Sequence, residues 1–318
     1  MGDNRLLRPS DFEQARQRIG DLVHRTPLLS CRTLSHRVGG DLQFKAELFQ
    51  KTGSFKIRGV FNRLLTLSAE ERSRGLVSIS AGNHAAALAY GASAVGSQAT
   101  IVMPATAVAS KIAATRDYGG EVILTGEGLL ETCRQVERER DLVFVHPFDD
   151  LRIMAGHGTL GLELAEDLRD LALLIVPVGG GGLIGGAATA LKLIRPDVRV
   201  VGVEPEGADA MTRSLAQGKP VHLDTLNTIA DGLAAPFVGA HNLAHVDEFV
   251  DEVVTVSDRQ ICEATRALLF HAKLAVEPSG AAGLAALFSG GVKLPSSGST
   301  CCVISGGNID RNVLCRIV

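Results

Sequence analysis

Short apolar runs and helix-length apolar patterns alternate along most of this chain. Runs of strand length predict β-strands at residues 41–48, 76–80, 99–103, 122–125, 142–145, 171–178, 198–203, 253–256 and 301–305. Apolar residues at helical spacing predict helices at residues 55–67, 85–95, 160–168, 257–272 and 279–288, and onward from residues 110, 129 and 183. Strands that alternate with helices of this length are typical of parallel sheets covered on both faces.

Local signals mark several of the predicted boundaries. Ser10 followed by Glu13, and Ser68 followed by Glu71, match the capping box that begins a helix. The residue before a proline is driven out of the helical region, so residues 24–29 are expected to be extended. No linker separates two domains, and we therefore expect the chain to cross between lobes more than once.

The composition narrows the class of protein. With 46% hydrophobic and 21% charged residues, the 318-residue chain is typical of a globular protein with ample core. A formal net charge of −3 gives no reason to expect nucleic acid or an acidic membrane as a partner, and no apolar run reaches membrane length. Thirty-five glycines indicate many tight turns and close backbone approaches.

The six cysteines are scattered and include no Cys-x-x-Cys pair, which argues against a structural zinc site and a disulfide scaffold. Cys301 and Cys302 lie in an apolar run and are predicted to be buried. The first residues lack the apolar core of a signal peptide, so a cytoplasmic location is expected.

Lys56 is the strongest candidate for a catalytic residue. It lies between Phe55 and Ile57, after the small residues Gly53 and Ser54. An ammonium group held against apolar surface loses solvation, which lowers its pKa and makes the neutral amine available. Neutral lysine amines attack carbonyls, form Schiff bases and accept protons. Taken alone, the pattern also fits an ordinary surface lysine at the start of a helix.

Three predicted strands end at turns rich in small residues, and ligands of open α/β sheets bind outside the carboxyl ends of strands. The first turn contains Ser80, Ala81, Gly82, Asn83 and His84. Main-chain amides at the following helix N-terminus would suit a carboxylate, although a capped helix after a tight turn is an equal alternative. Another such turn, Ser305 to Asn308, is on its own no more than a turn.

The remaining turn consists of Gly179, Gly180, Gly181 and Gly182, directly between a strand and a helix. Clustered amides at a helix N-terminus form a nest for a phosphate. The spacing differs from that of a P-loop. Gly180, Gly182 and Gly185 match a fragment of G-x-G-x-x-G, so a dinucleotide-binding fold is the competing interpretation.

Together, residues 54–59 (SFKIRG), residues 80–84 (SAGNH), the four glycines and residues 305–308 (SGGN) resemble the β-family, or fold type II, of pyridoxal-phosphate enzymes. Within it the chain is most similar to the threonine/serine dehydratase and serine racemase group. The resemblance implies a two-lobed α/β fold of the tryptophan synthase β type. It also implies a large domain of residues 1–72 and 150–318 and a small domain of residues 73–149.

The resemblance implies a role for each of these residues. Lys56 carries pyridoxal 5'-phosphate as a Schiff base and is the catalytic base, and the four glycines hold the phosphate. Phe55, Gly232 and Glu277 lie along the ring. Asn83 contacts the phenolic oxygen, Ser305 faces the ring nitrogen, and residues 80–84 bind the substrate carboxylate. The implied reaction converts a small β-hydroxy amino acid, L-threonine or L-serine, to a 2-keto acid and ammonia.

Several residues depart from the family's pattern. Similar racemases have a serine where this chain has Ala81, and a methyl group carries no proton, so dehydration is favoured over racemisation. Metal-binding members have a Glu and an Asp six residues on. Here the residue six positions after Glu204 is Ala210, so the site for a divalent or monovalent cation is incomplete. Glu204 and Ala208 are its candidates, with Asp209, one residue off, and Glu206 as further candidate ligands. His157 replaces a usual glutamine, which leaves 3-hydroxyaspartate or an aryl serine open as the substrate.

The partners expected from the resemblance are a small amino-acid substrate and further copies of the chain, in a homodimer or larger homo-oligomer. A non-catalytic or nucleotide-binding α/β protein that retains the glycine turns is the alternative from a different class. Replacement of Lys56 separates the two hypotheses.

Overall fold

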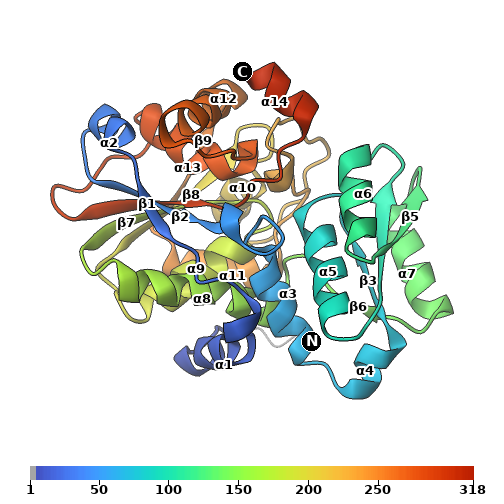
Figure 1. Ribbon diagram of the computed structural model, residues 1–318. Coiled ribbons are helices and arrows are strands. Elements are labelled where there is room, and N and C mark those ends of the chain that lie inside the picture. The colour runs from blue at the N-terminus through green and yellow to red at the C-terminus, as the bar shows by residue number, and fades with distance from the viewer. Residues whose placement is uncertain (1–4) are drawn as a thin grey trace.

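The computed structural model describes residues 5–318 and contains two sheets, each with helices packed against it (Figure 1). The six-stranded sheet has the order β1-β2-β10-β7-β8-β9, and the four-stranded sheet has the order β5-β4-β3-β6. Neighbouring strands are parallel except for β1 and β2, which pair antiparallel. The predicted α/β fold with parallel-based sheets is confirmed, with one antiparallel strand at the edge.

The large sheet combines strands from both ends of the chain. They are β1 (Leu28–Ser30), β2 (Leu42–Ala46), β7 (Leu171–Pro177), β8 (Arg199–Pro205), β9 (Glu252–Val256) and β10 (Ser299–Ile304). One face is covered by α2 (Arg32–Val38), α12 (Asp258–Ala267) and α13 (Pro278–Phe288). The other is covered by α8 (Leu151–Asp167), α9 (Gly182–Lys192), α10 (Ala210–Gln217) and α11 (Ala240–Phe249).

The small sheet lies in the middle of the sequence. Its strands are β3 (Leu76–Ile79), β4 (Ala99–Pro104), β5 (Glu121–Thr125) and β6 (Val143–Phe144). One core of this sheet contains α3 (Lys56–Leu65) and α5 (Asn83–Ala94), and the other contains α7 (Leu129–Glu139). The predicted boundaries of the small domain at residues 73 and 149 stay a prediction, and α3 packs on the small sheet although it precedes residue 73.

The remaining elements connect or flank the two sheets. They are α1 (Pro9–Ile19), α4 (Ala69–Arg74), α6 (Ala109–Asp117), α14 (Arg311–Ile317), the short turns η1 (Gly20–Leu22), η2 (Glu47–Phe49) and η3 (Asp231–Leu233), and the π-helical turn η4 (Leu268–Ala272). Helix α1 packs on α8. Across residues 5–318, helices with the length and apolarity needed to cross a membrane are absent.

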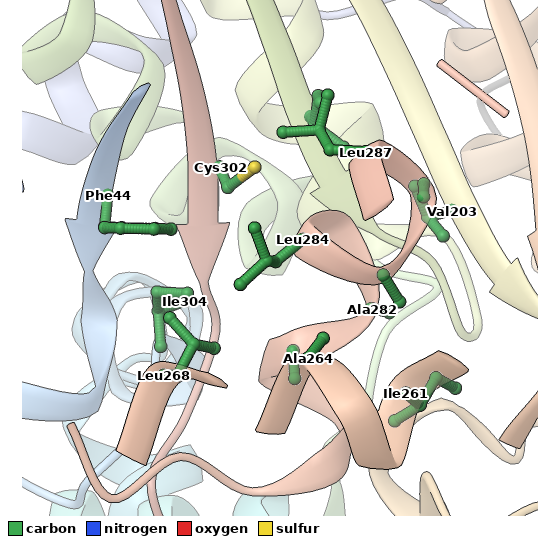
Figure 2. Packing of buried hydrophobic residues seen from close by; sticks show 14 of the residues in the cluster. Phe44, Val203, Ile261, Ala264, Leu268, Ala282, Leu284, Leu287, Cys302 and Ile304 are labelled. Carbon is green, nitrogen blue, oxygen red and sulfur yellow. The ribbon is translucent and has the colours of Figure 1, made fainter. Parts of the chain in front are cut away.

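Adjacent residues of the central strand β10 enter two different cores. Cys302 and Ile304 pack with Phe44 beneath α12 and α13 (Figure 2). Cys301 and Val303 pack on the opposite face, beneath α8 and α9. This alternation follows from the two-residue period of a strand, and a strand that is buried on both faces is apolar at nearly every position. The prediction that both cysteines are buried is confirmed.

Two helix starts differ from the predictions. Helix α1 begins at Pro9 rather than after Ser10, and the Asp11 carboxylate accepts the amide of Arg8 at 2.8 Å, so the predicted capping box was wrong. Helix α8 begins at Leu151, well before the predicted residue 160, and Asp150 caps it. Its glycines hid this start, since glycine is a poor helix former.

The second predicted capping box is confirmed. The Ser68 hydroxyl accepts the Glu71 amide at 3.1 Å, and the Glu71 carboxylate accepts the Ser68 amide at 2.7 Å. Helices α2, α10, α11 and α14 were not predicted at all.

Candidate active site

A cavity of about 720 Å³ lies between the two sheets, beyond the carboxyl ends of their strands. Its walls include the turns that follow β3, β6, β7 and β10. Twelve of the residues predicted for the site line it: Phe55, Lys56, Ser80, Ala81, Gly82, Asn83, His84, Gly179, Gly180, Gly232, Glu277 and Ser305. The strand-end argument therefore found residues that the fold does bring together.

Lys56 belongs to the first turn of α3, and it lines this cavity. Its amine donates a hydrogen bond to the carbonyl of Pro147 at 3.1 Å and lies 5.2 Å from the centre of the Phe55 ring. Burial lowers the pKa of Lys56 to about 8, although the nearby carboxyl group of Glu277 acts in the opposite direction. The sequence led us to expect this shift, and it makes neutral amine available near physiological pH.

Two main-chain hydrogen bonds join the turn before Lys56 to the turn after β10. The Phe55 amide donates to the Ser305 carbonyl at 3.1 Å, and the Gly307 amide donates to the Gly53 carbonyl at 2.9 Å. Gly53 has φ of 72°, and a Cβ atom there would lie 2.4 Å from Oδ1 of Asn308. Only glycine meets both conditions, so it allows the close approach that brings Lys56 and Ser305 into one cavity.

A buried ionic cluster holds the other side of α3. Both carboxylate oxygens of Glu47 accept from the Arg58 guanidinium at 2.8 Å, and those of Glu163 accept from it at 2.6 and 3.0 Å. Lys45 forms an ion pair with Glu163 at 2.6 Å. The Arg58 side chain is fully buried. Because Arg58 lies two residues after Lys56, this cluster fixes the helix turn that carries the amine.

All four glycines have close neighbours, and at Gly180, Gly181 and Gly182 an added Cβ atom would lie within 3 Å of another atom. A Cβ atom would lie 3.1 Å from Cα of Leu233 at Gly179, and 2.5 Å from the Phe148 ring at Gly180. Gly181 has φ of 90°, and Gly182 is the first residue of α9. Gly179 and Gly180 line the cavity, and the first turn of α9 presents amides that have no acceptor within the helix.

The turn after β3 forms the cavity wall that belongs to the small sheet. The Gly82 amide donates to the Ser80 hydroxyl at 3.2 Å, and α5 begins at Asn83. The His84 ring is buried and contacts the Ser78 hydroxyl at 3.1 Å. Burial places the pKa of His84 well below its usual value, so the imidazole is neutral.

Glu277 also lines the cavity. Its carboxyl group accepts a hydrogen bond from the Asn83 side chain at 2.7 Å, which joins the walls of the two sheets. Burial raises the pKa of Glu277 to about 7. The Gly232 amide donates to the Ser279 hydroxyl at 2.9 Å and thereby holds the main chain of η3 against the cavity.

The candidate metal residues lie elsewhere. Glu204 ends in a carboxylate that accepts the amides of Met211 and Thr212 at 2.8 and 2.9 Å, so it stabilises the start of α10. Neither Glu204 nor the buried Ala208 lines the cavity. Among residues 5–318 there is no group of three or more His, Cys, Asp or Glu side chains that could hold a metal ion.

The sequence analysis missed several cavity residues. An ion pair joins Lys111 to Asp231, and an aromatic wall contains His146, Phe148 and Phe237. His146 and Phe148 follow β6, so the strand-end argument could have found them. No local signal marks Lys111, because its position in the cavity depends on how the two sheets pack.

These residues fit pyridoxal 5'-phosphate. An amine of lowered pKa suits an aldehyde, and a crowded turn of four glycines suits a phosphate that must approach main-chain amides. The hydroxyl of Ser305 and the side chain of Asn83 supply uncharged polar groups in the same cavity.

Comparisons with known proteins agree with this geometry. Residues 19–306 match the model of the family described as "Pyridoxal-phosphate dependent enzyme". The chain is 44% identical over 317 residues to an L-threonine ammonia-lyase of Thermotoga maritima, a match that covers 98% of this chain and 78% of the relative.

Solved structures give the same result. The structure of maize serine racemase matches with a TM-score of 0.94 and 41% identity, over 98% of this chain and 97% of that chain. The structure of a serine racemase from Dictyostelium discoideum matches with a TM-score of 0.89 and 37% identity, over 96% and 99% of the two chains. A threonine deaminase from T.th. matches with a TM-score of 0.89 and 40% identity, over 95% and 98% of the two chains.

Proposed function

The chain belongs to the family of pyridoxal-phosphate-dependent enzymes, and we propose that it is an ammonia-lyase that dehydrates L-threonine or L-serine to a 2-keto acid and ammonia. The observation that carries this proposal is the Lys56 amine, with a pKa lowered to about 8, in one cavity with the glycine turn after β7. The similarity to an L-threonine ammonia-lyase and to a threonine deaminase supports the same activity.

We propose that the cofactor is held from several sides. Lys56 would bind its aldehyde carbon, and the amides of residues 179–182 would hold its phosphate. Ser305 offers the ring nitrogen a neutral hydroxyl, which would not keep that nitrogen protonated as a carboxylate would. Phe55, Asn83, Gly232 and Glu277 complete the surroundings proposed for the ring.

The substrate would bind through its carboxylate at residues 80–84. The amides at the start of α5 and the positive end of its helix dipole favour an anion there. Binding at this point fixes the orientation of the Cα–H bond relative to the Lys56 amine. The apolar side chains of Leu129, Phe144 and Phe237 in the cavity wall limit the access of water.

Proton transfer would depend on Lys56. When bound, the cofactor supplies an electron sink for the charge left on the substrate Cα after its proton leaves. Nζ of Lys56 is the group placed to accept that proton, because burial keeps a fraction of the amine neutral near pH 8. The β-hydroxyl group would then leave with a proton as water. The enamine product, through its imine tautomer, is hydrolysed by a second water molecule to the 2-keto acid and ammonia.

Racemisation of serine is the second candidate, favoured by the similarity to maize serine racemase. It requires a second proton carrier on the opposite face of the substrate. Ala81 lines the cavity and has only a methyl group. We therefore expect elimination to exceed racemisation, and an Ala81→Ser variant to gain racemase activity. Chiral analysis of serine recovered from the reaction measures both activities.

The residues of the cavity are also compatible with larger β-hydroxy amino acids as substrates. Arg134 and the aromatic wall line the same cavity as residues 80–84. The Arg134 cation would suit the second carboxylate of 3-hydroxyaspartate, and the aromatic wall would suit the ring of an aryl serine. Steady-state rates for L-threonine, L-serine, 3-hydroxyaspartate and phenylserine rank these substrates directly.

The decisive experiment combines spectroscopy and product analysis. The wild-type protein with pyridoxal 5'-phosphate is expected to absorb near the edge of the visible range, and L-threonine should shift this band and release keto acid. Lys56→Ala should lose both the band and the activity while it remains folded. A wild-type protein without the band, or a Lys56→Ala variant with full activity, would refute the proposal.

We also propose a homodimer or larger homo-oligomer in a cytoplasmic, reducing compartment. Support for the compartment comes from the six cysteines, which are free thiols. Exposed apolar side chains such as Phe49 and Phe270 are consistent with contacts between copies. Light scattering of the purified protein tests the assembly.

A further inference from the structure

Asn242 contacts the glycine turn at the carbonyl of Gly180. It belongs to α11 and is completely buried, and it does not line the cavity. Its side-chain Nδ2 donates a hydrogen bond of 2.6 Å to the carbonyl oxygen of Gly180. The Gly239 amide, just before the same helix, approaches this oxygen at 3.5 Å.

This hydrogen bond fixes the direction of one peptide group. The peptide between Gly180 and Gly181 is trans, since residues 5–318 contain no cis peptide bond. In a trans peptide the carbonyl and the following N–H point in opposite directions. Because the Gly180 carbonyl points to α11, the Gly181 N–H points away from α11.

The close neighbours of Gly181 disfavour a larger side chain but do not by themselves fix the direction of this peptide. A Cβ atom at Gly181 would lie 2.6 Å from Cε of Met211 and 2.9 Å from Cβ of Asn242. Glycine nevertheless has no intrinsic preference for the observed φ of 90°. A polar contact is therefore needed to select this orientation from those that glycine can adopt.

The hydrogen bonding of Asn242 differs from that expected of a residue that only stabilises the fold. Its Oδ1 is buried, and within the described residues it has no hydrogen-bond partner. A buried acceptor without a partner destabilises the folded state, and an apolar side chain of the same size would avoid that cost. The benefit of the amide is therefore expected in the orientation of the turn.

We propose that Asn242 is a positioning residue that directs the Gly181 N–H toward the cofactor phosphate. It thereby sets the preference of the protein for the phosphorylated cofactor over the unphosphorylated aldehyde. The inference rests on the proposed function, because it assumes that the glycine turn holds the phosphate. Asn242 itself touches neither the cofactor nor the substrate.

The test compares two ligands that differ only in the phosphate. Cofactor-free full-length protein is titrated with pyridoxal 5'-phosphate and with pyridoxal, and binding is followed by absorbance. Asn242→Leu keeps the volume and removes the donor. We expect it to weaken binding of pyridoxal 5'-phosphate by roughly 10- to 100-fold, the effect of one hydrogen bond to a charged group. Binding of pyridoxal should change by less than about threefold, within the range of a small packing change.

Asn62→Leu is the matched control. Asn62 is also a buried asparagine whose Nδ2 donates to a main-chain carbonyl, that of Arg152 at 2.7 Å, but it lies on α3 and does not line the cavity. Its replacement is expected to leave the ratio of the two affinities unchanged. Asn242→Thr retains a donor and should recover part of the preference, and it also serves if Asn242→Leu does not fold.

Each outcome has a defined meaning. An equal loss of affinity for both ligands, or no loss for either, would overturn the role of Asn242, as would an equal change of the ratio in Asn62→Leu. A wild-type protein that binds neither ligand would refute the proposed function and this inference with it. A wild-type protein that binds both ligands equally well would refute the phosphate role of the glycine turn and leave the role of Lys56 intact.

Discussion

At the scale of single residues, the chemistry depends on the protonation of Lys56. Its amine reacts with an aldehyde only when neutral, and its pKa of about 8 lies far below the ordinary value of 10.5. The rate at which cofactor-free protein binds pyridoxal 5'-phosphate should therefore rise with pH and level off above a midpoint near 8. Stopped-flow absorbance between pH 6.5 and 10 measures this profile, and a midpoint above 10 would contradict it.

The same shift predicts an effect on stability. Between pH 8 and 10.5 the unfolded chain binds the Lys56 proton more strongly than the folded chain, so Lys56 destabilises the cofactor-free protein most below pH 8. Lys56→Met should raise the free energy of unfolding at pH 7 by about 1–3 kcal/mol, a range that allows for solvent in the cavity. Urea unfolding measures the change, and the exposed Lys219, changed to Met, should give almost none.

Part of the predicted site has a local signal. Lys56 stands between apolar neighbours, and Gly179 and Gly180 lie in the turn after β7, so their chemistry is visible within a few positions. Gly232 and Glu277 were expected only from the family resemblance. Asn242 and Lys111 have no such signal, because each acts on a residue far away in the sequence. The structure also gives a reason for the four glycines that the sequence did not show, namely close neighbours that disfavour an added Cβ atom.

At the scale of elements, α3 depends on the ionic cluster around Arg58. Removal of this guanidinium would leave Glu47 buried without its ion-pair partner and Glu163 with Lys45 alone. We expect Arg58→Met to lower the free energy of unfolding by about 3–5 kcal/mol and to weaken cofactor binding, because α3 carries Lys56. The exposed pair of Arg16 and Glu166 is the control, and Arg16→Met should cost no more than about 1 kcal/mol.

The start of α9 gives a second prediction at this scale. Gly181 and Gly96 both have positive φ, but only at Gly181 would an added Cβ atom have neighbours within 3 Å. Gly96→Ala should cost about 1–2 kcal/mol, the penalty for the left-handed conformation alone. Gly181→Ala should cost about 1–3 kcal/mol more, because Met211 must move, and it should also weaken binding of the cofactor. Equal effects of the two variants on unfolding would contradict this account.

Helices and strands with a strong local hydrophobic pattern were predicted correctly, and those with a weak pattern were shortened or missed. Buried parallel strands such as β7 were found because every position is apolar. Helix α8 was cut short because Gly156 and Gly158 lower helix propensity, whereas the structure uses them for close contact with α3 and α1. Helix α11 was missed because His241, Asn242 and His245 interrupt its apolar pattern. The side chains of Asn242 and His245 are explained only by tertiary contacts, to the Gly180 carbonyl and the Leu7 amide.

At the scale of the whole molecule, the cavity exists because two sheets present their carboxyl ends to each other. Each sheet could be predicted as parallel from its alternation with helices, but the strand order β1-β2-β10-β7-β8-β9 could not. That order joins residues more than 250 positions apart, as in the pairing of β2 with β10. It is also what brings Ser305 next to the turn that precedes Lys56.

The burial of many ionisable groups gives the whole molecule a defined response to acid. Burial lowers the pKa values of four histidines, namely His84, His146, His157 and His245. Below pH 6.5 these histidines therefore bind protons in the unfolded chain but not in the folded chain. Glu204 and Glu277 act in the opposite direction, since pKa values raised to about 7 let the folded chain bind more protons between pH 4.5 and 7. The histidines outnumber the glutamates, so stability should fall as the pH falls below 6.5.

The contribution of His157 to this acid response can be measured separately. Its pKa of about 3 in the folded protein, against 6.5 in the unfolded chain, makes its contribution to stability complete above pH 6.5 and progressively smaller below it. Urea unfolding of the cofactor-free protein should show a loss between pH 7.5 and 5.5 that is smaller in His157→Gln by about 1.4 kcal/mol. Glu277→Gln should enlarge the loss, because it removes a group that opposes it. If His157→Gln and the wild-type protein lost the same free energy, the imidazole would have to be protonated within the fold, against the burial that surrounds it.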